Sequence, residues 1–280
     1  MIEIRATADL RRQIRNWKSA GESIVLVPTL GNLHAGHLAL VQAARTHGHR
    51  VVVSIFVNPT QFVAGEDYEQ YPRTLEADLE HLQHYAVDLV YCPGVTDIYP
   101  DPAGPGTEVS VPALDGIFCG ASRPGHFTGV ATVVTRLFNL VQPDKAVFGE
   151  KDYQQLLLIR KLVHDLHFPI EIIAHPTVRE ADGLALSSRN QYLDETQRQA
   201  APAMHQTLSA IRDRILSGDS DYGALERYGR QRLEEAGFRV DYVSIAAATD
   251  LGEPWDDDCV VLAAAWLGRA RLIDNLLLGG

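Results

Sequence analysis

Short apolar runs rich in β-branched residues alternate with amphipathic segments through the first 175 or so residues of this 280-residue chain. The apolar runs lie at residues 23–27, 50–57, 87–92, 144–149 and 170–174. The amphipathic segments between them lie at residues 36–48, 74–85, 129–141 and 152–166. Strands that are apolar on both faces and alternate with helices are typical of a parallel sheet covered on both sides. The pattern therefore predicts a doubly wound α/β domain.

The pattern changes after the stretch HPTVREADGLALSSRN, which covers residues 175–190. Two helical segments, at about 194–217 and 221–236, precede apolar runs at 240–246 and 259–266. Helices followed by strands in this order predict a smaller α+β domain. We therefore expect a Rossmann-like, parallel-sheet domain over residues 1–176 and a smaller α+β domain over residues 177–280.

Composition and charge exclude several classes of protein. A formal net charge of −11 argues against a general binder of nucleic acid or of a membrane surface. The longest apolar runs fall short of the ~20 residues that a membrane span requires, and the first residues lack the apolar core of a signal peptide. The scattered cysteines Cys92, Cys119 and Cys259 favour neither a zinc site nor a disulfide framework. We expect a cytoplasmic protein without a nucleic-acid or membrane partner.

The stretch PTLGNLHAGH, residues 28–37, follows the first apolar run where a helix is expected to begin. Ligands of open parallel sheets bind at the carboxyl ends of the strands, and a helix N-terminus suits phosphate. Gly31 permits a tight turn, and Gly36 lets a ligand lie against the backbone. His34 and His37 can donate hydrogen bonds to phosphoryl oxygens as charge builds up on them. The alternatives are a zinc half-site, or capping and packing by the two histidines.

Three further segments bring polar side chains to strand ends or to the domain junction. Gln61 follows the second apolar run in FVNPTQF, and Lys151, Asp152 and Gln155 follow a later run in FGEKDYQQ. The junction segment GLALSSRN carries two serines and an arginine at residues 187–189. Together with the histidines, these groups suit a triphosphate and a small polyhydroxy carboxylate better than they suit a metal.

Five segments together resemble the pantothenate synthetase family. They are PTLGNLHAGHLALV, SIFVNPTQF, EDYEQYPRTLEADL, RPGHFTGVATVVTRLFNLVQPDKAVFGEKDYQQLLLIRKLV and PTVREADGLALSSRN, and they cover most of residues 23–192. The HxGH motif alone would indicate only the wider nucleotidyltransferase group. The resemblance implies an ATP-dependent ligase of pantothenate and coenzyme A biosynthesis. Such an enzyme condenses (R)-pantoate with β-alanine to pantothenate, AMP and pyrophosphate through a pantoyl-adenylate intermediate.

The resemblance also implies roles for the matching residues. The catalytic residues would be His34, His37, Lys151, Ser187, Ser188 and Arg189. The ATP-binding residues would be Leu30, Gly31, Asn32, Leu33, His34, Ala35, Gly36, His37, Gly149, Glu150, Lys151, Asp152, Val178, Leu186, Ser187, Ser188 and Arg189. Gln61 and Gln155 would bind pantoate or β-alanine, because amides bond hydroxyls and carboxylate without adding charge. Leu30 stands where the family usually has methionine, and its apolar contact should serve equally.

ATP chemistry implies Mg²⁺, which we expect to be held mostly by phosphate oxygens. Asp78 is a candidate for an outer contact to the metal, the alternative being a solvated helix carboxylate. The acidic stretch EPWDDD at residues 253–258 is interpreted as a solvated turn rather than a metal site. His126 is expected to lie at the start of a helix and not to act as a catalyst. The resemblance further implies a homodimer in which residues 177–280 form a lid.

Two other functions remain open at this point. One is a non-catalytic nucleotide sensor on the same fold, which would not need the two histidines, Lys151 and Arg189 to stabilise a transition state. The other is a related nucleotidyltransferase that makes a dinucleotide or activates another carboxylate. A phosphorylated second substrate would call for cations at the positions of Gln61 and Gln155, which are uncharged. A tRNA synthetase is disfavoured by the chain's length and acidity.

Overall fold

The computed structural model describes residues 1–101, 106–255 and 258–279. It divides into two compact units. Unit 1 comprises Met1–Gly149 and Leu158–His175, and unit 2 comprises Glu150–Leu157 and Pro176–Gly280. The expected division after residue 176 differs from these units, because unit 2 also includes Glu150–Leu157 and Pro176, and the functional meaning of that division stays a prediction. Asp256 and Asp257 of the expected acidic turn lie outside the described residues.

The sheet of unit 1 has six parallel strands in the order β1-β4-β3-β2-β5-β6 within the described residues. The strands are β1 (Ile2–Ile4), β2 (Ile24–Thr29), β3 (Arg50–Ile55), β4 (Leu89–Tyr91), β5 (Lys145–Gly149) and β6 (Glu171–His175). β2 lies between β3 and β5, so the strand order reverses there. Such a reversal opens a crevice at the carboxyl ends of the strands, where ligands bind. The predicted doubly wound, Rossmann-like domain is confirmed.

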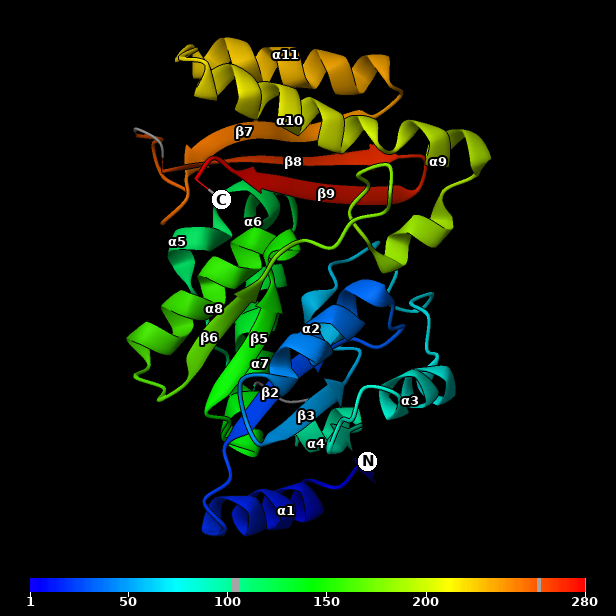
Figure 1. Cartoon of the computed structure of the whole chain (residues 1–280), viewed down its shortest axis with the longest axis vertical. Helices are drawn as coiled ribbons and strands as arrows, with labels where there is room; N and C mark the ends of the chain where they lie inside the picture. The colour runs from blue at the N-terminus through cyan, green and yellow to red at the C-terminus, as the bar shows by residue number, and fades with distance from the viewer. Residues whose placement is uncertain (102–105, 256–257, 280) are drawn as a thin grey trace. The chain divides into compact units, whose positions relative to one another are not determined.

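Helices cover both faces of this sheet, and α2 lies across β2, β3 and β5 (Figure 1). The helices and turns that follow the strands are α1 (Thr7–Ser19), α2 (Ala35–Arg45), η1 (Pro59–Gln61), α3 (Leu75–Gln83), α4 (Val95–Ile98), α5 (Pro112–Asp115), α6 (Phe118–Ser122), α7 (His126–Val141), η2 (Glu150–Asp152) and α8 (Tyr153–Asp165). Val25 and Val27 of β2 pack with Val41 of α2 and Leu82 of α3. The intervening Leu26 faces the opposite way and is also fully buried. Burial on both faces explains why these runs carry no polar alternation.

Unit 2 contains an antiparallel sheet in the order β7-β8-β9. Its elements are η3 (Ser188–Tyr192), α9 (Glu195–Ala200), α10 (Ala203–Leu216), α11 (Tyr222–Glu235), β7 (Arg239–Ala247), β8 (Cys259–Leu267) and β9 (Ala270–Leu277). α10 and α11 pack together on the sheet, with Ile211 and Leu233 in the same apolar cluster as Val261 (Figure 1). The predicted α+β class is confirmed. Among the described helices, none is both long enough and apolar enough to cross a membrane.

Two elements of unit 2 differ from the sequence prediction. The helix expected at 194–217 is divided, because Pro202 lacks the N–H group that would continue α9 into α10. β9 was not predicted, since Asp274 and Asn275 interrupt its apolar character even though both are buried.

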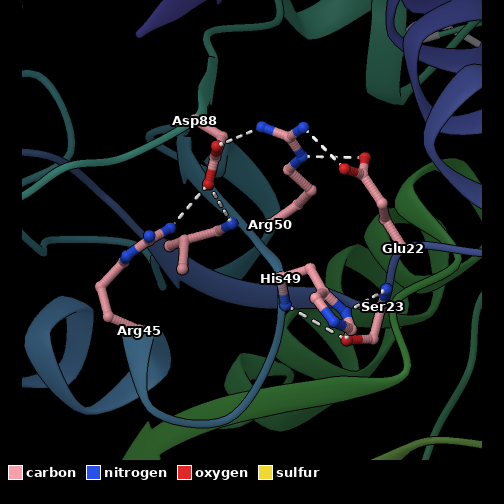
Figure 2. A network of polar contacts seen from close by, with 7 residues as sticks. Glu22, Ser23, Arg45, His49, Arg50 and Asp88 are labelled. Carbon is pink, nitrogen blue, oxygen red and sulfur yellow. Dashed lines mark hydrogen bonds and ion pairs between the residues drawn. The ribbon is translucent and has the colours of Figure 1, made fainter.

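Charged residues join the amino ends of β3 and β4 (Figure 2). Arg50, the first residue of β3, donates to Glu22 at 2.7 and 2.9 Å and to Asp88 at 2.9 Å. Asp88, which directly precedes β4, also accepts from Arg45 at 2.8 Å and from the N–H of Val51 at 2.8 Å. One carboxylate thus links the end of α2 to two strands. This edge of the sheet is opposite to the one where ligands of such folds bind, so the network has a structural role.

We expect Asp88→Asn to lower the melting temperature by a few degrees, because it removes the negative charge shared by two arginines and the N–H of Val51. Thermal and urea unfolding followed by circular dichroism would measure the loss. Asp165→Asn is the control, since Asp165 forms an exposed pair with Lys161 of the same helix, and such pairs contribute little. Equal midpoints for both variants and the original chain would contradict the assigned role.

Candidate active site

The turn between β2 and α2 is held in a single backbone conformation. The hydroxyl of Thr29 donates to the carbonyl of Ser54 at 2.8 Å and accepts from the N–H of Gly31 at 3.2 Å. Gly31 has a φ of +83°, and a Cβ there would lie 3.1 Å from Oδ2 of Asp78. Asn32 is also left-handed, with a φ of 51°. Both the left-handed backbone and the close carboxylate require glycine at position 31.

The buried carboxylate of Asp78, a residue of α3, accepts hydrogen bonds from the backbone of this turn. The residue is 2 % exposed, and its Oδ2 accepts the N–H of Asn32 at 2.9 Å. Its Oδ1 accepts the N–H of Leu33 at 2.8 Å and the hydroxyl of Thr74 at 3.2 Å. The interpretation of Asp78 as a solvated helix carboxylate is therefore wrong. Because its oxygens bind the turn, Asp78 has a structural role, and an outer contact with Mg²⁺ stays a prediction.

His34 and His37 cap the start of α2 through one nitrogen of each ring. Nδ1 of His34 accepts the N–H of Gly36 at 3.2 Å, and the N–H of His34 donates to Nδ1 of His37 at 3.3 Å. The ring centroids lie 4.0 Å apart. Because each Nδ1 is an acceptor, each neutral ring carries its proton on Nε2, which is then a donor. Capping and ligand binding are therefore compatible, since they use different nitrogens of the same rings.

Gln61 ends η1, which follows β3, and both its side chain and its backbone are held. Nδ2 of the buried Asn58 donates to Oε1 of Gln61 at 3.2 Å and to the carbonyl of Gly129 at 3.2 Å. The carbonyl of Gln61 accepts from Nδ1 of His126 at 2.6 Å and from Arg123 at 3.4 Å. The start of α7 thus fixes the turn that presents Gln61. His126 is the first residue of α7, as expected, and it is buried.

A partly buried ion pair completes this cluster. Arg123 donates to the two oxygens of Glu66 at 2.5 and 2.8 Å, and both side chains are 15 % exposed. Nε2 of His126 accepts from Arg123 at 2.8 Å. Burial would raise the pKa of Glu66, but the hydrogen bonds and positive charge of Arg123 outweigh burial and lower this pKa below its usual value. Glu66 is therefore a carboxylate at neutral pH and orients Arg123 toward Gln61.

In unit 2, the η2 turn presents Lys151. Nδ2 of Asn275 donates to the carbonyls of Glu150 and Lys151 at 2.8 and 3.0 Å. Nζ of Lys151 lies 3.8 Å from Oδ1 of Asp152, and the lysine side chain is 19 % exposed. Gln155 follows on the first turn of α8 and is partly buried.

The segment at residues 178–189 folds back on itself before η3. The N–H of Leu186 donates to the carbonyl of Val178 at 3.0 Å. The hydroxyl of Ser187 then accepts the N–H of Arg189 at 3.2 Å and caps η3, whose first residue is Ser188. Both η2 and η3 pack against β9. The two turns that carry Lys151 and Arg189 thus pack against one strand of unit 2.

The expected site residues of unit 1 lie at the carboxyl edge of its sheet. Residues 30–37 follow β2, Gln61 follows β3 through η1, and Gly149 ends β5. Because these strands are neighbours, their ends meet at the reversal of strand order.

Comparison with known proteins shows to which family this chain belongs. A family model described as pantoate-beta-alanine ligase matches residues 3–277. The chain is 54% identical over 278 residues to a pantothenate synthetase of Pseudomonas paraeruginosa, covering 99% of this chain and 98% of that protein. The chain belongs to the pantoate–β-alanine ligase family.

Solved structures of this family agree with that result. The crystal structure of pantothenate synthetase from Thermus thermophilus matches with a TM-score of 0.92 at 47% identity, covering 99% of each chain. Pantoate–β-alanine ligase from Francisella tularensis, solved with an ATP analogue and β-alanine, matches with a TM-score of 0.82 at 35% identity. It covers 100% of this chain and 98% of that chain. The predicted family and ATP-dependent ligase activity are confirmed, while the roles of individual residues stay predictions.

Sequence reasoning missed several residues that hold the segments of the candidate site. They are Asn58, Glu66, Arg123, Asp274 and Asn275. The dipeptide of Asn58 and Pro59, directly after a strand, is a turn signal that could have drawn attention to Asn58. The pair of Glu66 and Arg123 joins residues 57 positions apart, and no periodic pattern connects such positions.

We expect Gly129→Ala to raise the KM for pantoate several-fold and to destabilise the ligase by about 1–3 kcal/mol. A Cβ on Gly129 would overlap the carbonyl of Thr60 and lie 2.8 Å from Cα of Gln61, so the η1 turn must move. Steady-state kinetics and urea unfolding would measure the two effects. Gly116→Ala is the matched control, because no atom lies within 4 Å of its Cβ position. Unchanged kinetics and stability in Gly129→Ala would show that α7 does not fix the turn.

A second prediction concerns pH. Folding lowers the pKa of Glu66 below its usual value. The stabilisation by the pair of Glu66 and Arg123 is therefore fully present at neutral pH and is lost as the pH falls through the folded-state pKa. Glu66→Gln should therefore melt below the original chain at neutral pH, and the difference should shrink below about pH 4. Melting temperatures between about pH 3 and 7 would test this. Glu171→Gln, at an exposed carboxylate paired with Lys145, should show no such trend. A difference independent of pH would reject the ion pair as its cause.

Proposed function

We propose that this ligase activates (R)-pantoate at the carboxyl edge of the unit 1 sheet and joins it to β-alanine in two steps. The pantoate carboxylate attacks the α-phosphorus of ATP, giving pantoyl adenylate and releasing pyrophosphate. The amine of β-alanine then attacks the activated carbonyl carbon and releases AMP. The observation that carries the proposal is the start of α2 at the reversal of strand order, where Nδ1 of His34 and Nδ1 of His37 each accept a backbone N–H.

The phosphates of ATP are assigned to the start of α2. Backbone N–H groups and the positive end of the helix dipole favour an anion there, and the turn is held in advance by Asp78. Residues 30–37 and Gly149 contribute this part of the nucleotide site. Residues 150–152, Val178 and residues 186–189 contribute the part that belongs to unit 2.

In-line attack on phosphorus requires positioned reactants and neutralisation of charge on the phosphoryl oxygens. We assign the neutralisation of that charge to the Nε2 donors of His34 and His37 and to the cations Lys151 and Arg189. The hydroxyls of Ser187 and Ser188 supply further donors. His37 acts as a hydrogen-bond donor in the transition state, because pyrophosphate is a good leaving group that needs little protonation.

Pantoate is assigned to the amides of Gln61 and Gln155. Oε1 of Gln61 already accepts from Asn58, which orients its amide and leaves Nε2 of Gln61 as a donor toward an acid. An uncharged amide can bind carboxylate or hydroxyl without the strong field that would favour a phosphorylated acid. This feature supports pantoate over the phosphorylated second substrate of a related nucleotidyltransferase.

Mg²⁺ is assigned to the substrate MgATP and is held by phosphate oxygens. Across the described ranges, no group of three or more histidine, cysteine, aspartate or glutamate side chains could hold a metal ion. The carboxylate of Asp78 is engaged by the turn. We therefore assign no protein ligand to the metal. A lid role for residues 177–280, a homodimer and a cytoplasmic location complete the proposal, in keeping with the family resemblance.

ATP–pyrophosphate exchange with pantoate present and β-alanine absent tests the proposal directly. Exchange that depends on (R)-pantoate would establish the acyl-adenylate step and identify its acid together. (S)-Pantoate is the matched control acid, and it should support far less exchange. Failure of exchange in folded protein that binds ATP would reject pantoate adenylation before amine binding. The nucleotide-sensor alternative would then be favoured if added amine also failed to produce AMP.

We expect His37→Ala to lower the rate of this exchange by about 10²–10³-fold, because a donor used mainly in the transition state is removed. The affinity for ATP, measured by calorimetry, should change far less. His81→Ala, at an exposed position of α3, is the control and should exchange at the original rate. Near-normal exchange in His37→Ala would contradict the assigned role.

A further inference from the structure

The carboxyl-terminal part of β9 carries two adjacent buried polar residues. Asp274 is 4 % exposed and Asn275 is 6 % exposed. On the neighbouring strand β8 they pair in register with Ala263 and Leu262, which offer no polar side chain. Burying a carboxylate and an amide beside apolar residues is unfavourable unless both are fully hydrogen-bonded. Their hydrogen-bond partners therefore show what the two residues do.

Asn275 binds the turn that carries Lys151. Its Nδ2 donates to the carbonyl of Glu150 at 2.8 Å and to that of Lys151 at 3.0 Å. A single side-chain amide thus uses both of its N–H groups on consecutive carbonyls of η2. A turn of three residues satisfies few of its own backbone groups, so these two bonds largely decide its position relative to β9.

Asp274 binds the second segment through an arginine. Arg179 donates to the two carboxylate oxygens of Asp274 at 2.6 and 2.9 Å and to the carbonyl of Gly183 at 3.1 Å. Asp274 also accepts the N–H of Asn275 at 2.8 Å. A paired, two-bond contact between arginine and carboxylate fixes orientation as well as distance. Arg179 lies in the fold-back at residues 178–186, and residues 187–189 follow it directly.

We propose that Asp274 and Asn275 are positioning residues for the adenylation step. Two segments far apart in the sequence, one with Lys151 and one with residues 187–189, are fastened to neighbouring residues of a single strand. β9 thereby sets the spacing between the lysine and the serine and arginine side chains. In-line displacement is sensitive to errors of about 1 Å in such spacing. The inference rests on the proposed function, since that function assigns these side chains to the nucleotide.

Asn275→Asp tests the proposal with a change of almost no volume. The new carboxylate offers acceptors to two carbonyls, so both bonds to η2 are lost. We expect the kcat of pantoate-dependent ATP–pyrophosphate exchange to fall by about 10²-fold, with a much smaller change in the KM for pantoate. Asn139→Asp is the matched control, because that amide also donates to a backbone carbonyl, of Thr135 at 3.0 Å, at an exposed position. It should retain the original rate.

A double-mutant cycle separates positioning from general damage. If Asn275 acts by placing Lys151, Asn275→Asp should cost little further activity in a Lys151→Ala background, because the group to be placed is missing. Equal fold losses in both backgrounds would overturn the proposal, as would an unchanged kcat in the single variant.

Hydrogen–deuterium exchange provides a measurement that does not depend on activity. In Asn275→Asp, amides at residues 150–155 should exchange faster while those of β7 and β8 stay protected. Unchanged exchange at 150–155 would overturn the positioning role. Absence of pantoate-dependent activity in the original chain would instead reject the proposed function, so the two failures give different results.

Discussion

Burial of both faces of the parallel sheet confines the polar chemistry of unit 1 to the ends of its strands. Side chains along β2, β3 and β4 are needed for the core, and Val25, Leu26 and Val27 are fully buried. The two ends are used differently. The amino ends carry the network of Arg50 and Asp88, which stabilises the sheet, whereas the carboxyl ends carry the turn of His34 and His37. This division follows from the polarity that all parallel strands share.

Carboxylates with little solvent exposure hold three segments of the candidate site. Asp78 binds the N–H groups of the turn before α2, Glu66 orients the arginine beside Gln61, and Asp274 binds the arginine of the fold-back. Each carboxylate is hydrogen-bonded through both oxygens, as a charge with little access to water must be. The residues assigned to substrates lie in turns, loops and the ends of helices and strands, and these three acids fix the backbone or side chains beside them.

The sequence allowed prediction of most elements and of the family, because both depend on local patterns and contiguous motifs. Strand positions followed from apolar runs, and the residues assigned to ATP lie within a few short segments. β9 was not predicted because Asp274 and Asn275 interrupt its apolar pattern. The helical pattern continues through residues 194–217, but Pro202 divides that segment into α9 and α10. Asp78 was misread because helical periodicity places it on a face without showing what lies opposite. Such long-range pairings become visible only in three dimensions.

Because Glu150–Leu157 belongs to unit 2, the two units of this ligase cannot be produced as two separate continuous fragments. The chain passes between the units three times, so no single cut separates them. A fragment beginning at Pro176 would lack the turn that Asn275 binds. It would also lack Tyr153, whose hydroxyl donates to the carbonyl of Ala248 at 2.8 Å. Unit 2 is therefore not a transplantable module, and its exchange between relatives would have to include Glu150–Leu157 from the middle of the chain.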